Sequence, residues 1–415
     1  MTEAQFFTPE NIQLAKDYFL SEINKSKSKP NQHIFKEYIR RIFYYLITHR
    51  TKPRESKIID LKKINDILII RNDGIGDWIL STPVVEYFKK INPQLNVDAI
   101  ASDRNYELVR SNPFIRNVIT VHHNPSIIEL ISMGLKIRKY HKYDLIICLK
   151  HTEFTKQLIL LSIANLNNVP IISMGHSNPI RQKTYKLAFS NSTNITEINH
   201  WSNTLMELTK RNISGNSMLQ AKPSAYFSKS NFDNITEILK KYNLKYNIKA
   251  KYINIDNMPS QFLSSNNYII FNISGFETDR KLEENTIFEI LNTLFLNFPE
   301  TMIFLSGAEN DVEKIKQIEQ KINNKNCKGI NLNIMDFTAL LAGASCLISP
   351  DSGPVHIASA LQVPTIAFYK TYDKLVKWHP INTKFVAILK PNLSEINAID
   401  LQKAIELLKA QYKLF

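Results

Sequence analysis

The chain has 415 residues, 44% of them hydrophobic, so it is long enough to bury two cores of ordinary domain size. Its formal net charge of +14 and pI of about 9.4 favour acidic partners: nucleic acid, anionic lipid or phosphorylated substrates. No zinc-finger spacing, aromatic RNA-binding motif or Arg-rich arm accompanies the charge, so we expect no nucleic acid partner. The three cysteines are too few and too scattered for a disulfide framework, and the sequence has neither a signal-peptide pattern nor an apolar window long enough to span a membrane. We therefore expect a cytoplasmic protein.

Residues 1–63 are predicted to form a basic, helical N-terminal extension, with 13 Lys and Arg residues against 7 Asp and Glu. Apolar residues within it recur at helical spacing: Phe35, Tyr38, Ile39, Ile42, Phe43, Leu46 and Ile47. Such a helix suits an anionic membrane surface, or it docks its apolar stripe on the next domain. We favour docking, because most amphipathic helices pack inward.

From residue 64 onward, short apolar runs alternate with helical periodicity. The runs at 67–70, 97–101, 118–121, 145–149 and 170–174 predict strands, and the stretches at 78–91, 127–140 and 154–164 predict helices. Strands separated by helices of this length indicate a parallel sheet with helices on both faces. Residues 64–212 are therefore predicted to be a Rossmann-like domain.

Residues 213–265, rich in Lys, Asn and Tyr, interrupt this alternation and are interpreted as a connection with one helix near 231–242. The alternation resumes with predicted strands at 268–273, 301–305, 347–349 and 364–368 and predicted helices at 285–296, 311–322, 337–342 and 396–412, besides one that begins near residue 354. Residues 266–415 thus predict a second Rossmann-like domain, whose final helix is a candidate for packing back on the first. The expected fold is α/β, with two doubly wound domains and a ligand in the cleft between them.

The loop after the first strand, at residues 71–83, carries the first informative motif. Gly74 and Gly76 suggest a dinucleotide fingerprint, but its third glycine would fall at Ile79, and no Gly-Lys-Ser/Thr follows for a P-loop. What remains is a glycine-rich turn that ends in Asp77. A carboxylate there can accept a proton from an attacking hydroxyl, or it can cap the helix and complement its dipole.

A second motif lies at residues 347–369, where a predicted strand, a turn and a helix follow one another. Ser352 is a candidate N-cap, Pro354 suits the first helical position, and Gly353 allows a ligand close to the backbone. The start of such a helix suits a diphosphate, and His356 is a further donor for the same anion. The alternative is an ordinary strand–helix–strand unit with a surface histidine.

Together, the two motifs resemble glycosyltransferase family 9, the ADP-heptose:lipopolysaccharide heptosyltransferases. The N-terminal pattern of that family is matched by Arg71, Ile75-Gly76-Asp77 and Thr82-Pro83. Its C-terminal pattern is matched by Asp351-Ser352-Gly353, His356, Ala358, Ala360 and Pro364. Two motifs about 270 residues apart and in the right order are more specific than either one alone, and the resemblance covers roughly residues 65–410.

The resemblance implies a GT-B fold and an inverting glycosyltransferase that needs no metal and no cofactor. Asp77 is then the general base, with Gly74, Gly76 and Thr82 on the acceptor side of the N-terminal domain. The donor nucleotide-sugar is expected to bind the C-terminal domain at Asp351, Ser352, Gly353, His356, one of Arg280 or Lys281, and one of Glu309 or Asp311. The implied acceptor is a phosphorylated glycolipid at the inner face of the bacterial inner membrane, reached by peripheral contact with anionic lipid.

The chain departs from the family where Arg280-Lys281-Leu282-Glu283 replaces the common Lys-Arg-Trp-Pro. Another donor sugar, a nucleotide-sugar-binding protein without turnover, and an epimerase of the same architecture are the alternatives. His122-His123 has no carboxylate or cysteine at ligand spacing, so the sequence predicts no metal site there. A basic cluster at residues 136–142 is either a solvated face or a surface for lipopolysaccharide phosphates.

Overall fold

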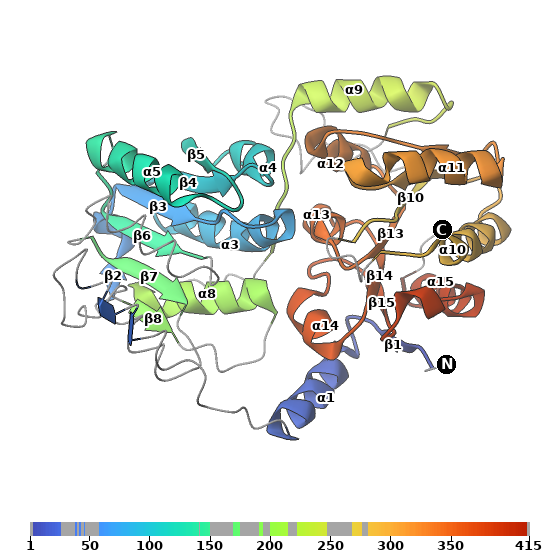
Figure 1. Ribbon diagram of the computed structural model, residues 1–415, viewed down its shortest axis with the longest axis horizontal. Coiled ribbons are helices and arrows are strands. Elements are labelled where there is room, and N and C mark those ends of the chain that lie inside the picture. Colours follow the sequence, from blue (N-terminus) through green and yellow to red (C-terminus); the bar gives the residue numbers. More distant parts are fainter. Residues whose placement is uncertain are drawn as a thin grey trace. The chain divides into compact units, whose positions relative to one another are not determined.

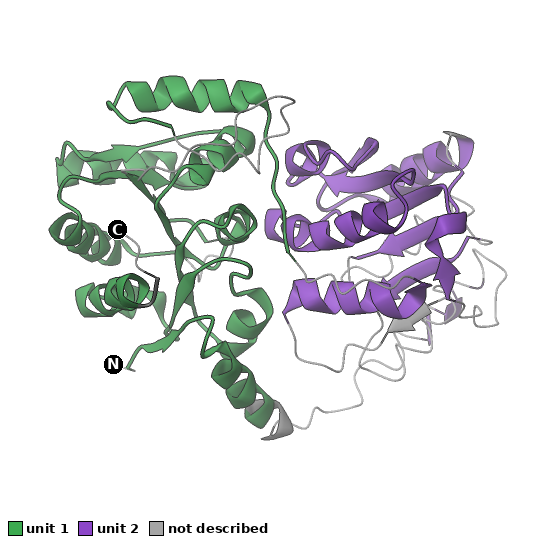
Figure 2. Cartoon of the chain, turned by 180° about the vertical axis from the view of Figure 1, so that it is seen from behind, with its two compact units in different colours: residues 1–23, 222–415 green, residues 24–221 purple. Residues whose placement is uncertain are grey.

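The computed structural model describes residues 3–25, 38–39, 41–42, 45, 58–140, 142–149, 169–174, 191–193, 200–214, 222–246, 268–275 and 281–412. The chain divides into two compact units, shown in different colours in Figure 2. The N-terminal unit is Asn24–Ala221, and the C-terminal unit combines Met1–Ile23 with Lys222–Phe415. The predicted helix at 154–164 lies outside the described residues.

The N-terminal unit is built on a parallel sheet of strand order β5-β4-β3-β6-β7-β8 (Figure 1). Its strands are β3 (Asp66–Ile70), β4 (Asn96–Ser102), β5 (Asn117–Val121), β6 (Leu145–Cys148), β7 (Ile171–Met174) and β8 (Asn191–Thr193). Its helices are α3 (Ile75–Ile91), α4 (Tyr106–Arg110), α5 (Ile127–Tyr140) and α8 (Trp201–Asn212). A separate short pair joins β2 (Ile59–Asp60) to β9 (Ile213–Ser214).

Strand β3 lies at the centre of this sheet, with Ile70 paired to Ile100 on one side and to Cys148 on the other. The chain adds β4 and β5 on one side of β3 and then returns to add β6 on the other side. This reversal is a topological switch point, where open α/β sheets bind ligands beyond the carboxyl ends of their strands. The loop that carries Asp77 begins at this place.

The sheet of the C-terminal unit has the order β1-β15-β14-β13-β10-β11-β12 within the described residues. Its strands are β1 (Gln5–Phe7), β10 (Tyr268–Asn272), β11 (Met302–Ser306), β12 (Cys327–Gly329), β13 (Cys346–Pro350), β14 (Thr365–Tyr369) and β15 (Phe385–Leu389). Its helices are α1 (Ile12–Lys25), α9 (Lys229–Lys240), α10 (Glu284–Asn297), α11 (Val312–Ile322), α12 (Ile334–Ala342), α13 (Gly353–Leu361), α14 (Tyr372–Trp378) and α15 (Ala398–Tyr412). Every pair of neighbouring strands is parallel except β1 with β15.

Alternate residues of these strands face a single apolar core. Ile269 and Phe271 of β10 belong to it, together with buried residues of α10, α11 and α15, because successive side chains of a strand point to opposite faces. Here, too, the chain builds β11 and β12 on one side of β10 and returns to the other side with β13. The motif at residues 347–369 therefore follows β13 at the switch point of its own sheet.

The start of the chain differs from the predicted extension. Gln5–Phe7 pair antiparallel with Leu389–Ala387 of β15, and Tyr18 of α1 stacks on Tyr372 of α14 with ring centroids 5.5 Å apart. The first residues therefore belong to the C-terminal unit. Of the predicted amphipathic helix, the described residues 38–39, 41–42 and 45 are helical, and the rest lies outside the described residues.

Two further features of the C-terminal half concern the final helix and the predicted connection. Leu401 and Ile405 of α15 are part of the C-terminal core, and the helix packs on α10 and β15. The predicted connection at 213–265 is partly built into the units, since β9 pairs with β2 and α9 packs on α12, where Asn231 donates to Asp336 at 2.8 Å. Among the described residues, we find no helix both long and apolar enough to cross a membrane.

Candidate active site

The loop between β3 and α3 is organised around Arg71, whose side chain is 2% exposed. Its guanidinium donates to the carboxylates of Asp73 at 3.0 Å and Asp77 at 3.1 Å, to the carbonyl of Leu149 at 2.7 Å and to that of Asp77 at 3.0 Å. Five donors in a rigid fork suit a site with several acceptors. Arg71 thus joins the loop, the start of α3 and the end of β6.

Asp77 occupies the third position of α3, and its two oxygens have different partners. Oδ1 accepts from Arg71, and Oδ2 accepts from the backbone N–H of Gly74 at 3.1 Å. The predicted capping role is therefore present. The side chain remains 24% exposed, and because each carboxylate oxygen has a second lone pair, Asp77 keeps acceptor capacity in a fixed orientation.

Gly74, Gly76 and Thr82 differ in their surroundings within this motif. A Cβ added to Gly74 would lie 2.9 Å from Oδ2 of Asp77, so the close approach requires glycine there. Gly76 is half-buried in the first turn of α3. Thr82, expected on the acceptor side, is instead buried, and its hydroxyl donates to the carbonyl of Ile79 at 2.8 Å. That carbonyl lacks its usual partner because Pro83 has no N–H, so Thr82 compensates for the proline.

A cluster that the sequence reading missed lies at the same edge of the sheet. Asp103 follows β4, and its Oδ2 lies 3.3 Å from both Nε2 of His122 and Nδ1 of His123. The absence of a carboxylate at ligand spacing in the sequence was therefore misleading, because adjacent parallel strands bring these residues together. His122 Nδ1 accepts from the N–H of Asn124 at 3.2 Å, which places the proton of a neutral ring on Nε2, toward Asp103.

The ionisation of Asp103 agrees with this hydrogen-bonded arrangement. Burial raises the pKa of Asp103, but hydrogen bonds from His123 and the charges of both histidines outweigh it, and the net shift is downward. We interpret the three side chains as a polar link between β4 and the loop after β5. Because Nδ1 of His122 accepts a hydrogen bond, the proton of the neutral ring lies on Nε2, and that nitrogen has no lone pair for a metal.

In the C-terminal unit, Asn272 connects the ends of β10 and β13. Its amide donates to the hydroxyls of Ser349 at 3.0 Å and Ser352 at 3.3 Å. Ser352 stands at the N-cap position of α13 with extended backbone, but its hydroxyl donates to the carbonyl of Pro350 at 2.9 Å and makes no capping bond. The start of α13 therefore lacks a side-chain cap. Among the first N–H groups of α13, that of Val355 donates to the carbonyl of Ser352 at 3.1 Å.

His356 and Asp351 are both buried in this structure. The ring of His356 meets Trp378 edge-on, with centroids 5.8 Å apart and an interplanar angle of 62°. The indole of Trp378 is only half-buried, so it lies between the histidine and the surface. The backbone N–H of Asp351 donates to the carbonyl of Phe368 at 2.9 Å, which ties the turn after β13 to β14. Gly353 begins α13 beside these residues.

A second buried network joins the loops after β10 and β11. The hydroxyl of Ser274 donates to Asp311 and accepts from the N–H of Ala308 at 2.7 Å, and Lys281 forms an ion pair with Asp311 at 3.2 Å. A Cβ at Gly307 would lie 2.7 Å from the Ser274 hydroxyl, so a glycine is needed there too. Ser274 and Gly307 were not among the predicted site residues, although both follow predicted strands.

Glu309 and Asp311, which the sequence left as alternatives, differ in burial and in their contacts with this network. Asp311 is buried and accepts from Ser274 and Lys281, whereas Glu309 is exposed in the short 3₁₀ turn before α11. Lys281 is 41% exposed and lies at the end of the loop. Arg280, its alternative as a phosphate contact, lies outside the described residues.

His379 gives a testable pH dependence for the C-terminal unit. Its ring lies 2.9 Å from the carbonyl of Leu375, and burial lowers the pKa of His379 from 6.5 to about 4. Between these values the unfolded chain binds a proton that the folded chain does not, so stability falls as the pH is lowered from 6.5 to 4. We expect a loss of about 2–3 kcal/mol over this window.

The measurement is urea unfolding at pH 7 and pH 4.5 for the protein and for His379→Gln, which cannot take up this proton. The variant should lose less stability than the original protein on acidification. Equal losses would mean that His379 contributes nothing to the pH dependence.

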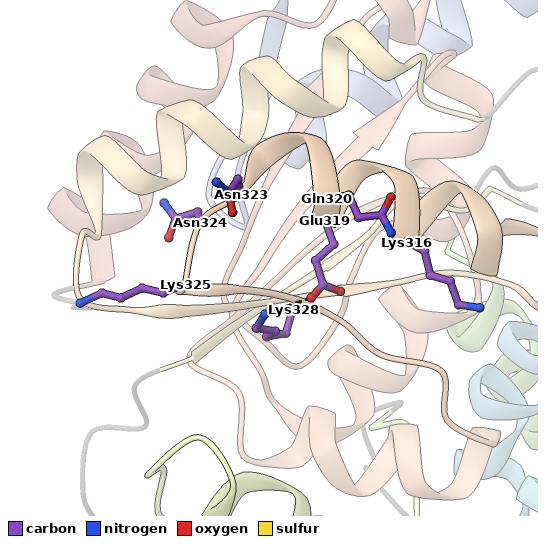
Figure 3. A pocket seen from close by; sticks show the side chains of 7 residues that line it. All are labelled: Lys316, Glu319, Gln320, Asn323, Asn324, Lys325 and Lys328. Carbon is purple, nitrogen blue, oxygen red and sulfur yellow. Dashed lines mark hydrogen bonds and ion pairs between the residues drawn. The ribbon is translucent and has the colours of Figure 1, made fainter.

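A polar surface hollow of about 500 Å³ lies elsewhere in the C-terminal unit, and Figure 3 draws the side chains that line it. It is lined by Lys316, Glu319, Gln320, Asn323, Asn324, Lys325 and Lys328. Glu319 pairs with Lys328 at 3.1 Å and accepts from the N–H of Gly329 at 2.8 Å. Because α11 runs back from the carboxyl ends of the strands, residues at its end lie toward the opposite edge of the sheet. We assign the hollow no part in the chemistry.

Two α/β units, each with a mostly parallel sheet and a predicted motif at its switch point, are the arrangement expected of the GT-B class. Residues 236–408 match the model of glycosyltransferase family 9 (heptosyltransferase). A Haemophilus influenzae protein named "Putative glycosyltransferase" is 24% identical over 349 residues, which cover 78% of this chain and 89% of that protein. Part of the C-terminal unit thus matches glycosyltransferase family 9, and the chain is a glycosyltransferase.

Solved structures agree on the fold. A family 9 glycosyl transferase from Veillonella parvula has a TM-score of 0.68 at 16% identity, over 85% of this chain and 99% of that chain. The E. coli ADP-heptose lps heptosyltransferase II has a TM-score of 0.62 at 17% identity, over 84% and 99%. The E. coli heptosyltransferase WaaC with ADP has a TM-score of 0.61 at 17% identity, over 83% and 99%. The expected GT-B fold is confirmed.

Proposed function

We propose that this glycosyltransferase is inverting and metal-independent, and that it transfers a sugar from a nucleotide diphosphate to the core of lipopolysaccharide or to a related glycan. Heptose from ADP-heptose is the first candidate donor, because structures of the same fold were solved with ADP and with ADP-2-deoxy-2-fluoro heptose. The observation that carries the proposal is the start of α13, which lies at a switch point without a side-chain cap.

The start of α13 suits the leaving group. Negative charge grows on the diphosphate as the glycosidic bond breaks, and backbone N–H groups at a helix start stabilise such charge. The N–H of Gly353 is the candidate, since that of Val355 is engaged and Pro354 has none. Fixed dipoles that are already oriented contribute to the rate when they hold the transition state more tightly than the ground state.

The residues around α13 complete the donor site in this proposal. Lys281, held by Asp311, supplies a positive charge toward the phosphates, and exposed Glu309 accepts hydrogen bonds from the ribose hydroxyls. Asp311 is then a positioning residue, because its oxygens already bind Lys281 and Ser274. Asp351 and His356 shape the turn from beneath, since both are buried.

On the acceptor side, Asp77 is the proposed general base. The acceptor hydroxyl gives its proton to the Asp77 carboxylate while its oxygen attacks the anomeric carbon from the face opposite the diphosphate. The diphosphate leaves with the bonding electrons, so the configuration at carbon inverts. Arg71 and the N–H of Gly74 hold the carboxylate in one orientation for this step.

Lys281→Met tests the donor site. Losing one charged contact to phosphate should weaken nucleotide diphosphate binding about ten-fold or more. Lys321→Met is the matched control, because Lys321 also pairs with an acid, Glu284, but on the outer surface of α10 and α11. Isothermal titration with ADP measures both variants. Equal affinities would remove Lys281 from the donor site.

The donor is identified by thermal shift with ADP-, UDP-, GDP- and CDP-sugars, since a ligand that binds only the folded state raises the melting temperature. The sugar that stabilises the protein is then tried in transfer, with NMR of the product anomer to test inversion and with EDTA to test metal independence. Binding without transfer to any lipopolysaccharide-type acceptor would favour a non-catalytic nucleotide-sugar-binding protein. We place the reaction at the cytoplasmic face of the inner membrane, where a glycolipid acceptor would be found.

A further inference from the structure

Helix α5 of the N-terminal unit exposes a continuous apolar stripe. Ile127, Ile128, Ile131 and Leu135 are all exposed, from 38% for Ile131 to 79% for Ile128. At 100° per residue these four positions fall within one arc of about 100°. The opposite face is buried through Leu130, Met133 and Ile137, so the exposed stripe is additional to the face that packs on the sheet.

The charges around this stripe are positive. Lys136, Arg138 and Lys139 are exposed on the last turns of α5, and Lys142 is exposed just beyond it. The acid of the helix, Glu129, accepts from the N–H of His122 at 2.6 Å, so its carboxylate is engaged with the preceding loop. An apolar stripe flanked by Lys and Arg is the pattern of a helix that lies in the interface of an anionic bilayer.

The loop that precedes α5 and the loop that carries Asp77 are both tied to β4 or the residue after it by hydrogen bonds. Ser102 donates to the carbonyl of Asp73 at 2.9 Å, and the N–H of His123 donates to Asp103 at 2.9 Å. Helix α5 starts after β5, so its Ile127 end lies at the same carboxyl edge of the sheet as the loop that carries Asp77. The basic end of the helix lies toward the opposite edge.

We propose that the exposed face of α5 is a membrane-docking surface for anionic phospholipid. Its apolar side chains enter the headgroup boundary and its Lys and Arg residues contact lipid phosphates. This inference rests on the proposed function in one respect, namely that the acceptor is a glycolipid. Docking through α5 would let that acceptor reach the loop that carries Asp77 from the membrane surface. The charge of the face favours a lipid surface over a second copy of this basic chain.

Sedimentation of the full-length protein with vesicles tests the surface. The protein should bind vesicles of phosphatidylglycerol and phosphatidylethanolamine, bind phosphatidylcholine vesicles far more weakly, and be released by salt. The variants I128S/L135S and R138Q/K139Q should each lower the partition coefficient about ten-fold or more. L296S and K325Q are matched controls, because Leu296 is 84% exposed and Lys325 is exposed on the other unit, and both should bind like the original protein.

Equal binding by the α5 variants and the original protein, or no binding to anionic vesicles, would overturn the proposal. A dimer that forms on size exclusion and is lost in I128S/L135S would overturn it in favour of self-association. With a lipid-free glycan acceptor the α5 variants should keep their kcat, whereas Asp77→Asn should lose transfer and still bind vesicles. The docking surface and the proposed function can therefore fail separately.

Discussion

Asp77→Asn is expected to lower kcat for transfer by about 100-fold or more, because general base catalysis typically contributes 10²–10⁴-fold. The amide keeps the size of the carboxylate, and its oxygen can still accept from Arg71 or from the N–H of Gly74. It cannot take a proton from the acceptor hydroxyl. The measurement is single-turnover transfer with saturating donor, beside a titration showing that donor affinity is unchanged.

Asp73→Asn is the matched control for this experiment. Asp73 also pairs with Arg71, at 3.0 Å, and stands four residues earlier in the same loop. If Asp77 served only the ion pair and the helix cap, the two variants would lose activity to a similar extent. A large loss in Asp77→Asn beside a small loss in Asp73→Asn supports the general base, and any other pattern counts against it.

Arg71→Met should give the largest loss of stability, about 3–5 kcal/mol in the unfolding of the N-terminal unit. The substitution removes a buried charge from between two carboxylates and leaves the carbonyl of Leu149 without this donor. The remaining acids are then close together with no opposite charge between them. Urea unfolding followed by tryptophan fluorescence measures the change, since Trp78 is buried in α3.

The control is Arg211→Met in the same unit. Arg211 pairs with Glu207 one turn earlier in α8, at 2.8 Å, and both side chains are about half exposed. Such a surface pair contributes less than about 0.5 kcal/mol. If Arg71→Met were no more destabilising than Arg211→Met, the buried ion pairs would not be what holds the loop.

Much of the candidate site could be predicted because its parts are local in sequence. A buried strand, a turn with glycine and a helix start follow one another at residues 67–78 and again at 347–361, and each step has its own residue preferences. The predicted strands in both units are confirmed, and each of their ends lies within one residue of the predicted end. The roles of Asp77 and of the start of α13 remain predictions that the experiments above test.

The features that the sequence did not predict include both contacts between distant segments and one local hydrogen bond. Strand β1 has three residues, too few to show a period of two, and it forms because the edge of β15 offers unpaired backbone groups. The hydroxyl of Thr82, which is predicted to lie on the acceptor side, donates to the carbonyl of Ile79, because Pro83 leaves that carbonyl without its usual N–H partner. The burial of His356 behind Trp378 depends on the path of α14, which no local pattern indicates.

The sequence by itself determined the alternation of strands and helices, the two doubly wound sheets and the placement of both motifs after central strands, because these depend on periodicity and on neighbouring residues. Only the tertiary structure brought Asp103 to His122 and His123, separated Glu309 from Asp311, and left one face of α5 apolar and exposed. These features arise where parallel strands end side by side, and that adjacency is set by packing of the whole sheet.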